Sequence, residues 1–74
     1  MSQLGNIRAS DIEKVLRKLG YGLHHQRGSH RYYVNAGKIV TVPVHKGKTL
    51  GKGLANKIIT RDIGISVNEF FQLL

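Results

Sequence analysis

The sequence has no cysteine, no tryptophan and only one proline among its 74 residues. Without cysteine, neither a disulfide framework nor a thiolate zinc site can form, although small secreted domains usually need such cross-links. The chain also has no stretch of about 20 apolar residues that could cross a membrane, and no apolar run of signal-peptide length near its start. We therefore expect a cytoplasmic protein that is not inserted in a membrane.

Acidic residues are scarce as well, because four Asp and Glu stand against twelve Lys and Arg, for a formal net charge of +8. No acidic residue occurs between Glu13 and Asp62, whereas that interval holds eleven Lys and Arg. Local salt bridges cannot neutralise so many cations, so we expect a positive field, for which polyphosphate is the commonest partner. The alternative is a basic surface that is only solvated. The charge pattern favours a protein that binds nucleic acid.

Helical patterns lie on both sides of a central segment of different character. Ser10 and Glu13 have the spacing of a capping box, and apolar residues at helical spacing follow, which predicts a helix over residues 10–19. Helical spacing returns over residues 49–63. A second capping box, which opens at Ser66, predicts a short helix at the C-terminal end.

The central segment, residues 21–44, consists of short stretches rich in Tyr, Val and Ile that turn residues separate. This pattern predicts three antiparallel strands, with turns at Gly28 and at residues 35–37. Alternating valines mark the buried face of the third strand. Pro43 has no N–H to donate, so we expect this strand to lie at an edge of the sheet.

The order of the elements predicts an α+β fold, namely an α-β-β-β-α two-layer sandwich with a short extra C-terminal helix. Double-stranded-RNA-binding domains have the same order and recognise RNA through phosphate and 2′-OH contacts. As a chain of this length falls below the roughly 100–200 residues usual for one domain, we expect residues 1–74 to form a single domain. Fold order alone supports RNA binding only by analogy.

Two further motifs fail on their structural requirements. Residues 47–49 imitate the end of a phosphate-binding P-loop, but Val42 stands where that loop needs its earlier glycine. His24 and His25 are adjacent in a predicted strand, so we expect them on opposite faces and unable to ligate one metal ion. We therefore expect no nucleotide hydrolysis, no metal and no cofactor.

The most specific pattern is RGSHRYY at residues 27–33, followed by TVPVH at 41–45, LGKGLANKI at 50–58 and a last helix that opens with IS and contains EFF. In this order and register the segments resemble the HicA family, also called YcfA-like, whose members are toxins of bacterial and archaeal toxin–antitoxin pairs. The resemblance extends over about residues 8–74. It implies a fold like that of double-stranded-RNA-binding domains, an endoribonuclease that cleaves messenger RNA independently of the ribosome, and neutralisation by a cognate HicB-type antitoxin.

The resemblance also makes His30 the catalytic residue, because it occupies the family's glycine-serine-histidine position. Gly28 then supplies the structural turn before it. We expect RNA contacts from seven residues on this segment, on the loop after the third strand and on the second helix, which are Arg27, Ser29, Arg31, Lys46, Lys48, Lys52 and Lys57.

The chemistry of metal-independent cleavage agrees with this assignment. The attacking ribose 2′-OH needs a proton acceptor and the leaving oxygen a donor, and an imidazole with an ordinary pKa near 6.5 serves either role. One histidine cannot fill both roles at once, so His45 is an auxiliary candidate, with water or a structural role for His45 as the alternatives. Strand parity groups His30 with Tyr32, which could turn it toward the core, unless a turn or bulge at Gly28 re-aims it. Of Tyr32 and Tyr33, which face opposite ways, we expect one to pack and leave the other free to stack on a base.

Two other functions stay open. The chain could be a non-catalytic RNA-binding module in which His30 is structural, or it could serve chiefly as an antitoxin's partner in a repressor complex. Toxicity on expression would separate the endoribonuclease interpretation from these two. Because the antitoxin must block a positive field, we expect it to be acidic and to cover the face that bears His30.

Overall fold

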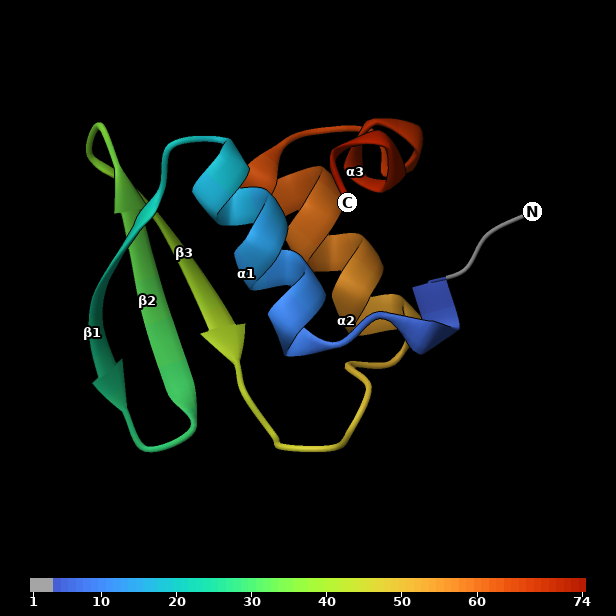
Figure 1. Cartoon of the computed structure of the whole chain (residues 1–74), viewed down its shortest axis with the longest axis horizontal. Helices are drawn as coiled ribbons and strands as arrows, with labels where there is room; N and C mark the ends of the chain where they lie inside the picture. The colour runs from blue at the N-terminus through green and yellow to red at the C-terminus, as the bar shows by residue number, and fades with distance from the viewer. Residues whose placement is uncertain (1–3) are drawn as a thin grey trace.

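The computed structural model describes residues 4–74 and has one three-stranded sheet and a layer of helices. Its elements are η1 (Leu4–Asn6), α1 (Ala9–Lys18), β1 (Gly22–Arg27), β2 (His30–Asn35), β3 (Lys38–Pro43), α2 (Lys52–Lys57), η2 (Ile58–Ile63) and α3 (Val67–Leu73). Here η1 is a 3-10 helix, and η2 is a π-helical segment that continues α2 directly. Figure 1 shows the sheet on one side of the molecule and the helices gathered on the other. The predicted α+β two-layer fold with an extra C-terminal helix is confirmed.

The first helix lies where the sequence predicts it, but its N-terminus is built differently. α1 begins at Ala9, and its N-terminal cap is Arg8, whose backbone N–H donates to the Asp11 carboxylate at 2.9 Å. The predicted capping box of Ser10 and Glu13 is therefore wrong. Asp11 satisfies the free N–H at the start of the helix, and this leaves Glu13 available for contacts elsewhere in the fold.

The sheet is an antiparallel meander with the strand order β1-β2-β3, so β3 is an edge strand as predicted. The turn between β1 and β2 contains Gly28 at φ 56°, a left-handed conformation that glycine adopts at little steric cost. β2 and β3 pair in continuous register from His30 opposite Pro43 to Asn35 opposite Lys38. In contrast, the register of β1 against β2 shifts between Leu23 and His25, where β1 carries a bulge.

The second helix begins later than the sequence predicts. Residues 49 and 50 are held by the N-terminal segment, because Thr49 forms an isolated antiparallel bridge with Arg8 and the Leu50 N–H donates to the Ile7 carbonyl at 2.8 Å. Gly51, at φ 85°, then turns the chain into α2. The predicted start at residue 49 is therefore wrong by three residues, whereas the helical end at residue 63 is confirmed.

The core lies between the sheet and the helices. Every layer contributes fully buried side chains, including Ile12, Val15 and Leu16 from α1, Tyr33, Val40 and Val42 from the sheet, Ile58 and Ile59 from η2, and Phe70 from α3. The predicted core face of β3 is thereby confirmed. Neighbouring residues of a strand point to opposite faces, so Arg31 lies on the helix side with Tyr33, and His30 lies on the open side with Tyr32.

Candidate functional site

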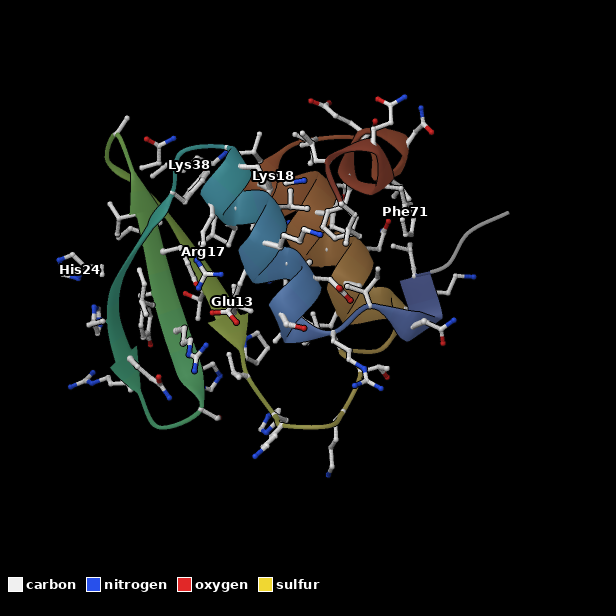
Figure 2. The ribbon with its side chains drawn as sticks, in the orientation of Figure 1. Glu13, Arg17, Lys18, His24, Lys38 and Phe71 are labelled. Atoms are coloured by element: carbon white, nitrogen blue, oxygen red, sulfur yellow. The ribbon has the colours of Figure 1, made fainter. Side chains whose placement is uncertain are left out.

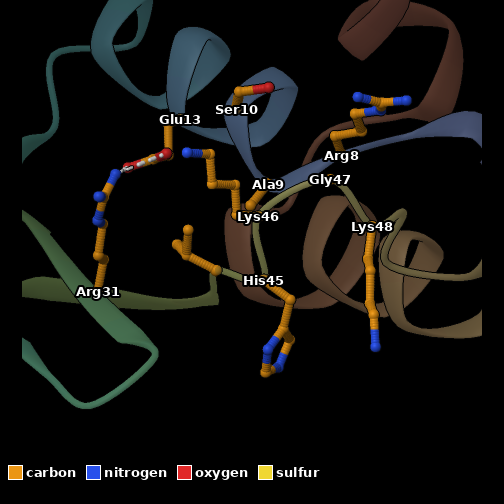
Figure 3. Close-up of a pocket in the computed structure, with 10 residues that line it drawn as sticks. Arg8, Ala9, Ser10, Glu13, Arg31, His45, Lys46, Gly47 and Lys48 are labelled. Carbon is orange, nitrogen blue, oxygen red and sulfur yellow. Dashed lines mark hydrogen bonds and ion pairs between the residues drawn. The ribbon is translucent and has the colours of Figure 1, made fainter.

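A pocket of about 340 Å³ opens where the first turns of α1 meet the end of β3 and the loop that follows it. Its walls are Arg8, Ala9, Ser10 and Glu13 from the start of α1, Arg31 from β2, and Val44, His45, Lys46, Gly47 and Lys48 from the loop. Figure 3 shows the Glu13–Arg31 pair at one end of the pocket and the Lys46 side chain extending toward it. In the same view, His45 and Lys48 point away from that pair. Most of the polar residues that line the pocket are basic, namely Arg8, Arg31, Lys46 and Lys48.

The loop that carries these cations is tied to the rest of the fold at both ends. At its start, the Val44 N–H donates to the Ser29 carbonyl at 2.6 Å. Within it, the Lys48 N–H donates to the His45 carbonyl at 3.1 Å, with Gly47 at φ 77° in the turn. At its end, Thr49 bridges to Arg8. These bonds keep residues 45–48 beside the first turn of α1.

Glu13 is the one acidic side chain that lines the pocket, and it is 4% exposed. Its two carboxylate oxygens accept hydrogen bonds from Arg31 Nη1 at 3.1 and 2.9 Å. One of them also accepts a hydrogen bond from the Tyr33 hydroxyl, which in turn accepts one from Arg17 at 3.2 Å. Figure 2 shows Glu13 and Arg17 on the side of α1 that faces the sheet. The buried charge is thus paired and hydrogen-bonded, as burial of a carboxylate requires.

The pKa values of this cluster follow from its structure. Burial, together with the hydrogen bond to Glu13 and its charge, raises the pKa of Tyr33 to about 12, because an ionised phenol would be desolvated and would face the carboxylate. The hydrogen bond and the charge of Glu13 raise the pKa of Arg31 above its already high ordinary value. Tyr33 therefore stays protonated and Arg31 charged at any pH at which the protein would act.

His30 is exposed at the first position of β2, next to the pocket but outside its lining. Its two chain neighbours both touch the pocket walls, since Ser29 is hydrogen-bonded to Val44 and Arg31 is itself a wall residue. Its side chain faces the open side of the sheet, so the alternative that parity turns His30 into the core is wrong. His45, the auxiliary candidate, is exposed and lines the pocket.

The seven residues predicted to contact RNA fall into three groups. Arg31, Lys46 and Lys48 all line the pocket. Arg27 lies opposite His30 in the β1–β2 ladder, Ser29 lies in the turn between them, and Lys52 starts α2; Arg27 and Lys52 are exposed and Ser29 is half-buried. Lys57 lies at the end of α2 and pairs with Asp62 at 3.6 Å.

Two cations thus have acidic partners, in contrast to the expectation that local salt bridges leave the basic interval unpaired. Arg31 pairs with Glu13, and Lys57 pairs with Asp62. The second pair is largely exposed, with 54% of the lysine side chain accessible, so it contributes little to stability. The other Lys and Arg side chains of this interval have no acidic partner among residues 4–74, so most of the predicted positive charge is unpaired.

The two adjacent histidines of β1 do not point to opposite faces as predicted. The bulge at this point breaks the alternation of the strand, and the Nδ1 atoms of His24 and His25 approach to 2.8 Å. The ring of His25 also stacks on Tyr32, with centroids 4.4 Å apart. Among residues 4–74 no group of three or more His, Cys, Asp or Glu side chains comes together. Tyr33 is fully buried and Tyr32 half-buried, which fits the expectation that one tyrosine packs.

Sequence reasoning missed Glu13, Arg8 and Ser10 as residues of the site. The sequence did hold a signal for Glu13, because it lies between the apolar residues Ile12 and Val15 on a helix whose inner side is otherwise apolar. An acid at such a position needs a partner in the fold, and the nearest chain segments offer mostly cations. The spacing of Glu13 from Ser10 led instead to its assignment to a capping box.

The fold and the pocket define a small basic domain of the type shared with double-stranded-RNA-binding proteins. The family model described as the HicA toxin of bacterial toxin–antitoxin systems matches residues 9–65. The chain therefore belongs to the HicA toxin family, so it is the toxin of a toxin–antitoxin pair and has an antitoxin partner. No curated protein matches the chain. Within the part of the chain that the structure describes, each helix is too short or too polar to cross a bilayer.

Proposed function

We propose that this toxin is a metal-independent endoribonuclease that cleaves messenger RNA in the cytoplasm as a single domain, with His30 as its catalytic residue. The observation that carries the proposal is the placement of an exposed imidazole at the start of β2, directly beside a basic pocket, in a member of the HicA family. An exposed histidine with no side-chain partner among residues 4–74 is free to reach a substrate.

In this proposal the cations and His30 have separate tasks. His30 transfers a proton to or from the reacting ribose phosphate, a contribution of about 10²–10⁴ in rate for a well-placed general acid or base. Arg31, Lys46 and Lys48 bind backbone phosphates of the RNA beside the one that reacts. Arg27, opposite His30 in the sheet, holds the RNA on the other side of the turn.

Induced expression in a bacterial host tests the toxin activity. The wild-type chain should arrest growth and deplete long messenger RNA, and His30→Ala should do neither at equal protein level. His24→Ala is the matched control, because it removes an exposed histidine from the neighbouring strand. Growth arrest by His30→Ala that equals the arrest by wild type would remove His30 from the mechanism.

We further propose that the partner is an acidic antitoxin of the HicB type that covers the face bearing His30. A partner of this charge would associate rapidly, at a rate that falls with salt. The purified pair should therefore form a stable complex without ribonuclease activity. Full activity in that complex would overturn this part of the proposal.

The second candidate is a non-catalytic RNA-binding module, and one observation favours it. His30 lies outside the pocket that Arg31, Lys46 and Lys48 line, so this basic pocket does not contain the proposed catalytic group. A module of this kind would bind RNA without cutting it. Wild-type protein that binds RNA tightly but leaves it intact would support this candidate.

A further inference from the structure

We propose that the pocket between α1 and the β3–α2 loop is a binding subsite for one backbone phosphate of the RNA, and that Glu13 is the positioning residue that orients Arg31 toward it. This inference rests on the proposed RNA substrate but not on cleavage. It assigns a role to a buried acid that the proposed proton transfer does not use.

The hydrogen bonds of Arg31 carry the first step. A guanidinium has five N–H donors. Nη1 donates to both oxygens of Glu13, and Nε donates to the Gln26 side-chain oxygen at 3.1 Å. Nη2 takes no part in these three hydrogen bonds. The guanidinium is thus fixed on two sides, and its third nitrogen is left to donate to an anion.

The packing of Glu13 carries the second step. The carboxylate cannot swing away from Arg31, because it is buried and also accepts a hydrogen bond from the Tyr33 hydroxyl. Tyr33 is itself fully buried, and Arg17 donates to its hydroxyl and lies over its ring at 5.9 Å. Arg31 is therefore anchored to the core through Glu13, although about a third of its own side chain is exposed.

The charges around the pocket carry the third step. Lys46 extends toward the Glu13–Arg31 pair, so an anion that accepts from Arg31 Nη2 would lie near a second cation, and Arg8 and Lys48 add positive charge farther along the pocket wall (Figure 3). Pre-orientation lowers the side-chain entropy lost when an arginine binds a phosphate, and the planar guanidinium matches phosphate geometry. Lys46 and Lys48 lie on the loop, and no side chain among residues 4–74 anchors them in a comparable way.

Charge and position predict opposite outcomes for one substitution. Glu13→Gln removes a negative charge beside a phosphate site, so electrostatics alone predicts tighter RNA binding. If Glu13 orients Arg31, the same substitution weakens binding, because the amide pairs less well with the guanidinium. We expect the dissociation constant to rise about three- to tenfold, the range expected when one well-placed charged hydrogen bond is weakened.

The probe is a short 2′-O-methyl RNA, which has no free 2′-OH for the proposed cleavage and thus reports binding alone. Glu69→Gln, which neutralises an exposed carboxylate in the first turn of α3, is the matched control and should leave binding unchanged or slightly tighter. The melting temperature of each variant is measured on the same preparation. Unchanged or tighter binding of folded Glu13→Gln would overturn the subsite.

A double-mutant cycle separates positioning from a general structural effect. Arg31→Met should weaken binding about tenfold, and adding Glu13→Gln to it should cost nothing further, because the residue through which Glu13 acts is gone. An equal loss from Glu13→Gln in both backgrounds would overturn the positioning role. Arg31→Lys keeps the test decisive if Glu13→Gln does not fold, since an ammonium paired with Glu13 cannot also present a fixed planar donor. Wild-type affinity of Arg31→Lys would contradict the proposal.

The result is independent of the proposed enzymatic activity. If the RNA is bound as described but no RNA is cut, the subsite stands and the nuclease proposal fails. If cleavage proceeds while Glu13→Gln and Arg31→Lys bind the probe as well as wild type does, the nuclease proposal stands and the subsite fails.

Discussion

Charge reversal in the pocket loop should weaken RNA binding and lower its dependence on salt, because both depend on the number of phosphate contacts. Four exposed cations surround the pocket or follow it directly and have no ion-pair partner among residues 4–74, namely Arg8, Lys46, Lys48 and Lys52. If each neutralises one phosphate, these four contacts alone give the plot of log affinity against log salt a slope of about −2.8, at about −0.7 per phosphate of a single strand. Affinity then falls about 50-fold between about 50 and 200 mM salt. With Lys46→Glu and Lys48→Glu combined, two contacts are left and the same change in salt costs only about sevenfold.

Fluorescence anisotropy of a labelled 2′-O-methyl RNA, titrated across that range of salt, measures both slopes. Lys14→Glu combined with Arg61→Glu is the matched control, because it changes the net charge equally but lies outside the pocket lining. The control should keep the wild-type slope. A wild-type slope shallower than about −2, or equal flattening by the control pair, would refute phosphate binding centred on this loop.

Three further predictions concern catalysis, ionisation and the core. His30→Ala should lower the cleavage rate by about 10²–10⁴ while costing less than about 0.5 kcal/mol of stability, because the His30 side chain is exposed. His45→Ala should retain most activity. The melting temperature and the cleavage rate across about pH 5–8 check both variants, and lowered stability with wild-type cleavage would be the contrary result for His30. Because burial raises the pKa of Tyr33 from 10.0 to about 12, the folded state favours the protonated phenol, so its contribution to stability is complete below pH 10.0 and is lost as the pH rises toward about 12. The phenolate absorbance that Tyr33→Phe removes should titrate near that higher value, and a midpoint near 10.0 would contradict the burial argument. Phe70→Ala should cost about 3–5 kcal/mol in urea denaturation, since Phe70 is fully buried, and a loss below about 1 kcal/mol would show that α3 is not part of the core.

The elements that sequence predicted well are those that local periodicity specifies. α1 and the alternating valines of β3 follow from the spacing of apolar residues, and the turn at Gly28 follows from the chemistry of the turn itself. The start of α2 could not be predicted in this way. Residues 49 and 50 have helical spacing, but the N-terminal segment pairs with them, and that contact joins residues about forty positions apart.

The site was predictable in composition but not in arrangement. The resemblance predicted His30 as the catalytic residue, and the charge pattern predicted RNA contacts from Lys46 and Lys48. Neither showed that His30 and the pocket lie on different sides of β2. Glu13 was assigned to the helix cap because its spacing from Ser10 offered a local explanation. Its partners lie 18 and 20 residues away, so only the packing of α1 on the sheet brings them together.

The bulge in β1 is a third case. Alternation predicts opposite faces for adjacent residues of a strand, and nothing in the residue types at positions 23–25 announces the extra residue. The structure shifts the register there and brings His24 and His25 together. Side-chain parity was therefore a sound guide on β2 and β3, where the register is continuous, and failed on β1.

The central claim is that this HicA-family toxin cleaves RNA through His30 without a metal ion. The most direct measurement incubates the purified wild-type chain and His30→Ala with a long RNA in excess chelator and follows the loss of full-length RNA, with His24→Ala as control. The account predicts that wild type and His24→Ala cut the RNA at similar rates, whereas His30→Ala binds it and leaves it intact. Intact RNA with wild type, or cleavage by His30→Ala at the wild-type rate, would contradict it.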